Sequence, residues 1–296
     1  MRIKDSVALV TGASSGIGAA AANRLAARGA RVILHGRDEA RLAELADRLD
    51  ADHLVADLAD GAAVDRLAAA ALDVAGRIDV LVHNAGIGWA GRFDAMPEAT
   101  AAHLVAVNLV APIRLTRLIL PSMLAARRGQ VVFVTSIAGR TAVAGEAVYA
   151  ATKAGLDIFA ESLAFELSGT EVRVGVFVPG VVDTPFFARR GMPYRRTRPR
   201  PQPVEQVAEG LVEMIASGRP ERYAPRWLRL PVAIRATAPG VYRRLAARFG
   251  QAPTGHPQLD GRTAATASRD RASLSGRATP ADGDDRRGHS VPSAGG

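Results

Sequence analysis

A tyrosine and a lysine placed four residues apart are the side chains of this sequence best suited to chemistry. Tyr149 and Lys153 stand in the segment Tyr-Ala-Ala-Thr-Lys, and residues four apart lie on the same face of a helix. A free tyrosine titrates at about pH 10, so it is a poor base at neutral pH. A neighbouring ammonium favours tyrosinate and lowers that pKa. We therefore predict that Tyr149 exchanges a proton with a substrate oxygen while Lys153 adjusts its acidity.

Two further observations bear on this pair. Only two of the 38 basic residues are lysine, Lys4 and Lys153, which indicates that position 153 needs a compact ammonium that arginine cannot replace. Ser136 follows an apolar segment, and its hydroxyl could hydrogen-bond the same substrate oxygen and stabilise the charge that develops there. The alternative is that Tyr149 is packed in the core of an ordinary helix.

A glycine-rich segment near the N-terminus reads Thr-Gly-Ala-Ser-Ser-Gly-Ile-Gly over residues 11–18. Small residues between a strand and a helix let the backbone approach a pyrophosphate, and the helix presents unpaired N–H groups to it. The spacing is Gly-x-x-x-Gly-x-Gly rather than the commoner Gly-x-Gly-x-x-Gly, and a plain strand-to-helix turn is the alternative. The predicted dinucleotide contacts are Gly12, Ser14, Ser15, Gly16, Ile17 and Gly18.

The residues after the second predicted strand indicate which dinucleotide binds. They read His-Gly-Arg-Asp over residues 35–38. An NAD site usually places a carboxylate at this strand end to accept hydrogen bonds from the ribose, but Gly36 occupies that position. Arg37 could hold a 2′-phosphate through charge-assisted hydrogen bonds, so we predict NADP in preference to NAD. Two alternatives stay open: Asp38 could be the ribose acceptor, and Arg37 could pair with Asp38 or Glu39 at the surface.

These motifs require elements that bring them to one edge of a sheet. We expect strands at 7–10, 31–35, 53–56, 78–83, 131–135 and 172–178, and helices at 17–28, 39–49, 61–75, 100–126, 148–167 and 204–216. The helix at 100–126 should bend or break at Pro112. The repeated strand–helix–strand units predict an α/β fold with a single doubly wound Rossmann-type parallel sheet and helices on both faces. Ligands of such sheets bind at the carboxyl ends of the strands.

The composition excludes several chemistries. The chain has 296 residues, of which 48% are hydrophobic and none is cysteine. Disulfides, thiolate zinc sites and cysteine nucleophiles are therefore excluded, and the sequence shows no recognisable cluster of metal ligands. The first residues lack the apolar stretch of a signal peptide, and no run reaches the roughly 18 apolar residues of a membrane span. We predict a cytoplasmic protein without a metal.

Positive charge is concentrated towards the C-terminus, where residues 189–250 contain 14 arginines against four glutamates. We divide the chain into a dinucleotide-binding and catalytic domain at 1–224, a basic amphipathic C-terminal extension at 225–250 and a tail at 251–296. The tail has few large apolar residues to offset its ordering entropy, so we predict that it is disordered. The extension would form a lid or subunit contact, or a weak contact with an anionic membrane surface through 225–249. No recognised nucleic-acid-binding module is present.

Together these motifs resemble those of the short-chain dehydrogenase/reductase family over about residues 5–188, and more loosely over 203–224. The resemblance implies an NAD(P)-dependent oxidoreductase that interconverts an alcohol and a carbonyl, with Ser136, Tyr149 and Lys153 as catalytic residues. It implies that Asn108 completes this set by anchoring a water in the proton relay. It assigns further cofactor contacts to Asp57, Leu58, Asn84, Ala85, Gly86, Tyr149, Lys153, Pro179, Gly180, Val182 and Thr184. Many NADP-preferring members carry a basic residue where this chain has Ser15.

Three loops after predicted strands, at 88–93, 139–146 and 185–192, are expected to contact the substrate. Their side chains are mostly apolar, which favours a lipophilic carbonyl or alcohol, although the same groups could simply pack the loops. The helices at 100–126 and 148–167 resemble those that form subunit contacts in the family, so we expect a homodimer or homotetramer. A second hypothesis is a non-catalytic dinucleotide sensor or membrane-docked binding protein. Such a protein has no evident need for the serine, the tyrosine and the lysine together.

Overall fold

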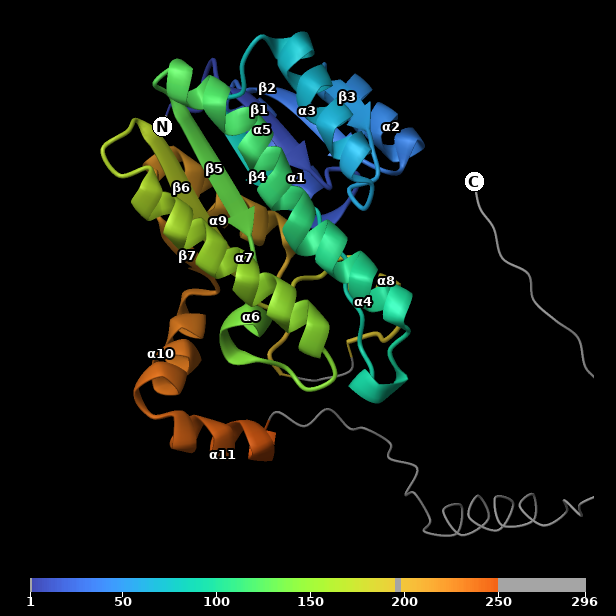
Figure 1. Cartoon of the computed structure of the whole chain (residues 1–296), viewed down its shortest axis with the longest axis vertical. Coiled ribbons are helices and arrows are strands. Elements are labelled where there is room, and N and C mark those ends of the chain that lie inside the picture. The colour runs from blue at the N-terminus through green and yellow to red at the C-terminus, as the bar shows by residue number, and fades with distance from the viewer. Residues whose placement is uncertain (1, 195–197, 250–296) are drawn as a thin grey trace, which may run out of the picture. The chain divides into compact units, whose positions relative to one another are not determined.

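The sheet that carries the predicted motifs has seven parallel strands in the order β3-β2-β1-β4-β5-β6-β7 (Figure 1). A computed structural model describes residues 2–194 and 198–249 of the chain. All neighbouring strands run parallel. The strands are β1 (Val7–Thr11), β2 (Arg31–Gly36), β3 (Asp52–Val55), β4 (Val80–His83), β5 (Gly129–Val134), β6 (Val172–Pro179) and β7 (Glu221–Ala224).

Continuous apolar runs explain why the central segments become strands. Every residue of β1, β4 and β5 is buried, which requires protein on both faces of the sheet. The register is continuous across the centre, since Leu9 of β1 lies beside Ile33 of β2 and Leu81 of β4. The carboxyl ends of these strands therefore finish at one edge of the sheet, where the following loops carry predicted site residues.

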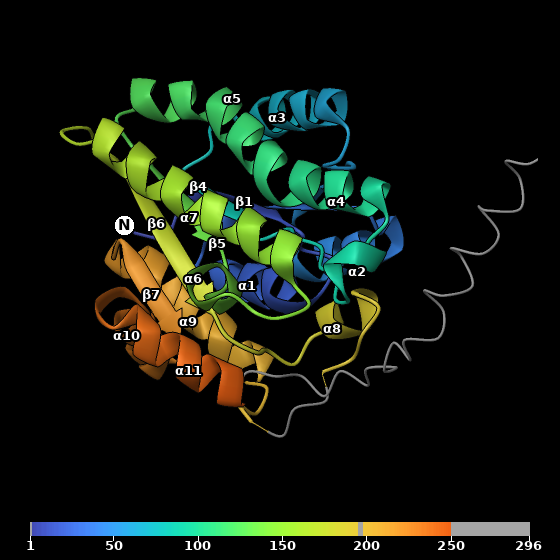
Figure 2. The ribbon, with the colours of Figure 1, turned by 60° about the horizontal axis from the view of Figure 1, so that its bottom comes forward.

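Two layers of helices cover the sheet (Figures 1 and 2). One layer contains α1 (Gly16–Ala27), α2 (Glu39–Leu49) and α9 (Val204–Ser217), and the other contains α3 (Gly61–Ala75), α5 (Ala111–Ala125) and α7 (Ala147–Glu166). Their buried side chains form one hydrophobic cluster on each face, with Leu25 and Leu211 in the first and Leu67, Leu115 and Leu156 in the second. The doubly wound parallel fold predicted from the sequence is confirmed.

The long helix expected at 100–126 is divided just before Pro112. The first part, α4 (Glu98–Val105), passes into a π-helical turn (Ala106–Val110) before α5 begins. Pro112 lies in the first turn of α5, a position that tolerates the missing N–H. The prediction that Pro112 bends or interrupts the helix is confirmed, because the π turn directly precedes the proline and contains Asn108, whose carbonyl oxygen receives no hydrogen bond from a proline four residues later and is crowded by its ring.

The helical stretch Glu98–Ala125 is long and apolar enough to cross a membrane, judged by length and composition, with a mean hydropathy of 1.5. The expectation that no segment meets such a criterion therefore needs correction. In the protein, 44% of its most apolar window is buried, and α5 packs against α3. A core helix meets the same criterion, and this packing accounts for the apolar character of the stretch.

Several short elements are not predicted from the periodicity of the sequence. β7 extends over only four residues, which is too short for an alternation of polar and apolar side chains to identify a strand. Part of the segment expected as a flexible loop at 189–203 is paired, since Gln202 forms a bridge with Val182. The other unexpected elements are α6 (Ile137–Thr141), α8 (Phe186–Arg189), η1 (Phe93–Ala95), η3 (Arg226–Leu228), α10 (Arg229–Thr237) and α11 (Pro239–Phe249).

The basic extension is attached to α6 through its last two helices. Arg235 of α10 donates a hydrogen bond to the carbonyl oxygen of Arg140. The hydroxyl of Tyr242 in α11 donates to the carbonyl oxygen of Thr141 at 2.5 Å. Both acceptors lie in the last turn of α6, so the extension satisfies carbonyl groups that a helix end leaves unpaired. The tail that we predict to be disordered, 251–296, lies outside the described residues.

A buried aspartate joins the amino ends of the central strands. Asp79 directly precedes β4, and its side chain is 1% exposed. Its carboxylate accepts from the backbone N–H of Val7 at 2.8 Å and contacts Arg77 and Arg128 at 3.2 and 3.0 Å. Both arginines are about half exposed, so the carboxylate is paired without the burial of a second charge.

Replacing Asp79 with alanine is expected to lower the free energy of unfolding by about 3 kcal/mol, because the buried N–H of Val7 loses its acceptor and two ion pairs disappear. Urea unfolding followed by circular dichroism measures this loss. Asp94→Ala is the matched control, since Asp94 pairs with Arg92 at 2.7 Å while both side chains stay exposed. We expect no measurable loss in the control. Equal losses in the two variants would contradict the role assigned to burial.

Candidate active site

The glycine-rich loop and the Asn84 loop leave the sheet side by side. β1 and β4 are neighbours, but the chain continues from β1 to β2 on one side and from β4 to β5 on the other. Such a switch point is where open parallel sheets bind ligands. The amide of Asn84 donates to the carbonyl oxygens of Thr11 and Gly12 at 2.9 and 3.2 Å. Asn84 therefore fixes the start of the glycine-rich loop.

The geometry of this loop requires glycine and leaves α1 uncapped. Gly12 has a φ of +69°, which favours glycine, and a Cβ at Gly18 would lie 2.3 Å from the carbonyl oxygen of Gly12. Ser15, the N-cap of α1, forms no capping hydrogen bond through its side chain, and the first turn contains no acid. The N–H groups of this turn are therefore available to an anion, so the residues present fit a dinucleotide pyrophosphate.

The residues after β2 test two alternatives left open by the sequence: that Asp38 accepts from the ribose, and that Arg37 pairs with a neighbouring acid. Asp38 is the N-cap of α2: it accepts from the backbone N–H of Arg41 at 3.2 Å and pairs with the guanidinium of Arg41 at 3.3 Å. The carboxylate is therefore engaged in its own helix. Arg37 is exposed, and within the described part of the chain it forms no ion pair with Asp38 or Glu39.

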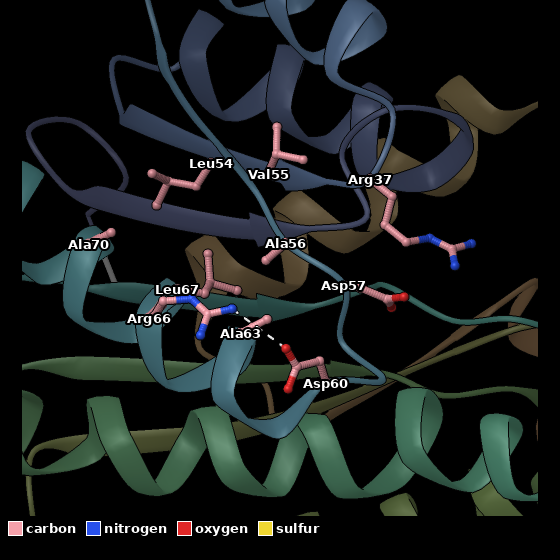
Figure 3. A pocket seen from close by; sticks show the side chains of 10 residues that line it. All are labelled: Arg37, Leu54, Val55, Ala56, Asp57, Asp60, Ala63, Arg66, Leu67 and Ala70. Carbon is pink, nitrogen blue, oxygen red and sulfur yellow. Dashed lines mark ion pairs between the residues drawn. The ribbon is translucent and has the colours of Figure 1, made fainter.

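A pocket of about 530 Å³ lies beside the end of β3 (Figure 3). Arg37 and Asp57 lie at one end of it, and Asp60 and Arg66 form an ion pair at 3.5 Å at another. The remaining lining is apolar and consists of Leu54, Val55, Ala56, Ala63, Leu67 and Ala70. Leu58 is buried beneath this segment. The structure thus brings Arg37 close to Asp57, as their predicted contacts with one adenosine moiety require.

Three predicted catalytic residues come together after β5. Ser136 is the N-cap of α6; its hydroxyl accepts from the N–H of Ala138 at 3.1 Å and shares a hydrogen bond with the hydroxyl of Tyr149. The ammonium of Lys153 donates to the carbonyl oxygen of Val134 at 3.0 Å. The side chains of Ser136, Tyr149 and Lys153 are all buried. Their geometry is compatible with the predicted chemistry, and their catalytic roles stay predictions.

Burial raises the pKa of Tyr149, contrary to the decrease that we expect from the sequence. The loss of solvation outweighs the hydrogen bond with Ser136 and the charge of Arg190, which both lower the pKa, and Glu146 raises it further. The expected dominance of the Lys153 ammonium is therefore wrong for the protein alone, because desolvation is the larger effect. Tyr149 is a protonated phenol at neutral pH, a form that can donate to a carbonyl oxygen.

Burial lowers the pKa of Lys153 to about 8, and the charge of Asp157 opposes this decrease. Asp157 lies one turn further along α7, and Arg140 holds its carboxylate at 2.6 and 3.1 Å. Arg140 in turn contacts Glu221 of β7 at 2.9 Å. Sequence analysis missed Asp157, although an acid four residues after Lys153 was a usable signal. This network keeps a carboxylate near the buried ammonium.

Asn108 holds the loop after β4 in place through hydrogen bonds to its backbone. Its side chain accepts from the N–H of Ile87 and donates to the carbonyl oxygen of Ile87, both at 2.9 Å, and it donates to Thr152 at 3.2 Å. A Cβ at Gly86 would lie 3.3 Å from the Lys153 ammonium and 3.4 Å from the Asn108 amide oxygen. The asparagine and the lysine therefore face the same glycine. The part of Asn108 in a proton relay stays a prediction.

Comparison with known proteins identifies the family. The family model described as short chain dehydrogenase matches residues 6–193, more than half of the chain. The chain belongs to the short-chain dehydrogenase family. It is therefore an oxidoreductase of the kind that acts on CH–OH groups of small molecules with a nicotinamide dinucleotide.

Three similar proteins illustrate how this short-chain dehydrogenase resembles known sequences and structures. A putative ketoacyl reductase of the granaticin polyketide synthase from Streptomyces violaceoruber is 38% identical over 190 residues, 62% of this chain and 70% of that protein. A short-chain dehydrogenase from Sphingobium yanoikuyae in complex with NADPH is 28% identical with a TM-score of 0.72, covering 86% of this chain and 99% of that one. A Burkholderia phymatum enzyme in complex with NAD, 24% identical with a TM-score of 0.74 over 86% of this chain and 100% of that one, shows the fold alone.

In this short-chain dehydrogenase the segment after β6 lies against the glycine-rich loop. Pro179 ends β6, and the N–H of Gly180 donates to a carbonyl oxygen of β7 at 2.8 Å. Val182 is buried, and the hydroxyl of Thr184 donates to its carbonyl oxygen at 3.5 Å. A Cβ at Gly16 would lie 3.2 Å from the Thr184 methyl group. Thr184 therefore lies beside the start of α1, as its predicted contact with the cofactor requires.

Two buried histidines next to the motifs are structural. His83 lies 2.8 Å from the hydroxyl of Thr116 and stacks on Phe133 with 4.9 Å between ring centroids. His35 lies 3.2 Å from the carbonyl oxygen of Ala56. Burial lowers the pKa of His83 to about 3 and that of His35 to about 4. Both rings are therefore neutral at physiological pH and serve as packed, hydrogen-bonded members of the core.

Two of the expected substrate loops, 139–146 and 185–192, meet beside Tyr149, and sequence analysis missed the ion pair that joins them. The ring of Phe186 lies 5.5 Å from that of Tyr149. Arg190 is buried, pairs with Glu146 at the start of α7 and lies over the ring of Phe187 at 4.6 Å. Arg190 and Glu146 are 44 residues apart, so only folding brings them together. This buried ion pair ties the segment after β6 to the helix that carries Tyr149.

Proposed function

We propose that this enzyme interconverts a lipophilic carbonyl compound and its alcohol, with NADP(H) as the preferred cofactor. The observation that carries the proposal is the buried group of Ser136, Tyr149 and Lys153, which lies at the carboxyl end of a sheet whose first helix begins uncapped. Uncapped helix N-termini bind phosphate groups. A buried phenol that is hydrogen-bonded to a serine can protonate a substrate oxygen.

In the direction of reduction the protein's own side chains handle the proton. The nicotinamide, when bound, supplies the hydride. The hydroxyl of Tyr149 gives its proton to the substrate oxygen, and Ser136 hydrogen-bonds the same oxygen while negative charge develops on it. The ammonium of Lys153, which is positive below about pH 8, stabilises the tyrosinate that remains. A relay that includes Lys153 and Asn108 then returns a proton to the phenol.

The preference for NADP rests on the end of β2. Gly36 stands where NAD sites carry an acid, and Asp38 is engaged as the cap of α2. Arg37 is exposed beside Asp57 at the end of the pocket in Figure 3, so its guanidinium can hold a 2′-phosphate by paired hydrogen bonds. A similar enzyme was solved with NADPH.

Apolar side chains near Tyr149 support a lipophilic substrate. Phe186 packs against the Tyr149 ring, and Phe187 packs edge-on against Phe186 with 5.5 Å between centroids. Phe93 and Met192, in two of the expected substrate loops, are 68% and 45% exposed. The name of one relative, a putative ketoacyl reductase, agrees with a ketone as the reacting group.

Exposed apolar residues on the long helices support a homodimer or homotetramer. Ile158 and Phe165 of α7 are 63% and 73% exposed, and Val110 and Leu124 at the α5 helix are 50% and 38% exposed. A second copy of the chain packed on these helices would remove these side chains from water.

The proposal is tested by following the oxidation of NADPH and NADH at 340 nm with a panel of lipophilic ketones. We expect turnover, with kcat/KM at least about tenfold higher for NADPH than for NADH, because Arg37 adds a charge-assisted contact to the 2′-phosphate. An equal or greater value with NADH would overturn the cofactor preference. Tight NADPH binding without turnover across ketones and alcohols would instead favour a sensor.

A further inference from the structure

The phosphate-binding loop of this enzyme contains no charged side chain of its own. Residues 11–18 are glycine, alanine, serine, threonine and isoleucine, and the first charged residue of α1 is Arg24. Arg24 and Arg28 both pair with Glu209 of α9, so they are committed elsewhere. A dinucleotide would therefore meet backbone N–H groups here, but no cation from the loop or from α1.

Arg189, which is far from this loop in the sequence, brings a positive charge to it. The guanidinium of Arg189 donates to the hydroxyl of Ser15 at 3.2 Å across 174 residues of sequence. Arg189 is the last residue of α8, which lies close to α1 (Figure 2). The contact between the Thr184 methyl group and Gly16 holds the preceding segment against the same loop. Two contacts, at Ser15 and at the adjacent Gly16, therefore place the segment 184–189 against this loop.

Arg189 is not engaged by a carboxylate. It is exposed, and among residues 2–194 and 198–249 no acid forms an ion pair with it. Its neighbour Arg190 is buried and paired with Glu146, so the two adjacent arginines have different environments. A guanidinium has five N–H donors, and a neutral serine hydroxyl uses one of them. The remaining donors have no acidic partner in the part of the chain that the structure describes, and the loop beside them has a backbone arranged for an anion.

We propose that Arg189 binds a phosphate group of the dinucleotide and thereby holds α8 over the cofactor. The proposal rests on the proposed function, because it assumes that the dinucleotide occupies the glycine-rich loop. A phosphate near Ser15 accepts from the N–H groups of α1 and from the guanidinium together, and arginine–phosphate hydrogen bonds are among the strongest in proteins. Arg189 supplies from a distant segment the basic group that the position of Ser15 lacks.

This contact joins cofactor binding to the substrate side of the site. α8 begins with Phe186, whose ring lies 5.5 Å from that of Tyr149, and ends with Arg189 at the phosphate loop. A phosphate that holds Arg189 therefore also holds the aromatic wall beside the catalytic tyrosine. Cofactor bound first would order the surface that the substrate meets.

The experiment measures dissociation constants for NADPH and NADH by isothermal titration calorimetry, without substrate. Arg189→Gln is expected to raise the dissociation constant for NADPH about tenfold, and Arg189→Lys, which keeps the charge but loses the planar fork, about threefold. Arg48→Gln is the matched control, because Arg48 is an exposed arginine in the last turn of α2 at the opposite edge of the sheet. The control should bind both cofactors as the wild type does.

The two cofactors distinguish the phosphate involved. A loss of affinity for both identifies the pyrophosphate, and a loss for NADPH alone identifies the 2′-phosphate. Added NaCl should weaken binding to the wild type more steeply than binding to Arg189→Gln, since one charged contact is missing from the variant. Wild-type affinity for both cofactors in Arg189→Gln would overturn this inference and leave the proposed function standing. A wild type that binds neither cofactor would overturn both.

Discussion

Replacing Tyr149 with phenylalanine is expected to lower kcat for carbonyl reduction by about 10³-fold, while the affinity for NADPH stays within about twofold of the wild type. The substitution removes the hydroxyl that donates the proton and that shares a hydrogen bond with Ser136. The ring keeps its packing against Phe186, so the fold is preserved. Steady-state kinetics and calorimetric titration with NADPH measure the two quantities separately.

A second tyrosine offers the matched control for this variant. Tyr242→Phe removes a hydroxyl that bonds to the backbone of Thr141 in α6, outside the group of Ser136, Tyr149 and Lys153. We expect kcat to change by less than about threefold in this variant, because only one neutral hydrogen bond is lost and its net free energy is small. Full activity of Tyr149→Phe would show that another group protonates the substrate.

Replacing Lys153 with methionine is expected to lower kcat/KM by about 10²-fold and to raise the stability of the protein at the same time. The activity falls because the ammonium that stabilises tyrosinate is lost. The free energy of unfolding rises because burial lowers the pKa of Lys153 to about 8 from its ordinary 10.5. A lowered pKa means that the charged ammonium destabilises the folded state, and methionine removes that destabilisation. We expect a gain of about 2 kcal/mol at pH 7 after allowing for the lost hydrogen bond to Val134.

The pH dependence of this gain has a definite sign. The cost of the buried ammonium is fully present below about pH 8 and disappears as the pH rises from about 8 to 10.5. The stability difference between the methionine variant and the wild type should therefore shrink over that interval. In the wild type, kcat/KM for reduction should fall as the pH rises through about 8, because the free enzyme loses the ammonium.

Urea unfolding at several pH values and a pH profile of kcat/KM test both statements for Lys153. Lys4→Met is the control, because Lys4 is the only other lysine and is exposed; this variant should keep the wild-type activity and pH profile. A methionine variant at position 153 that is inactive and also less stable would indicate a structural role and contradict the proposed one.

Most of the fold and the core of the site could be predicted because their signals are local. The glycine-rich turn lies between an apolar run and a helical pattern, and Tyr149 and Lys153 lie one turn apart on a single helix. Ser136 is the second residue after the end of the buried strand β5. In each case the spacing along the chain sets the spacing in space.

The missed features depend on contacts between distant segments or on competition between effects. Arg189 meets Ser15 across 174 residues, and no periodicity reports such a pair. The pKa of Tyr149 depends on how completely the phenol is buried, which outweighs the neighbouring charges.

The attachment of α10 and α11 to α6 has a consequence for the position of Ser136. α6 is five residues long, too short to be stable as an isolated helix. Ser136 caps its first end, while Arg235 and Tyr242 secure its last turn from about a hundred positions later. The orientation of the Ser136 hydroxyl thus depends in part on Arg235 and Tyr242, which lie outside the motifs of the site. A chain shortened at 224 would lose both contacts and let that turn fray, whereas Tyr242→Phe keeps the contact from Arg235.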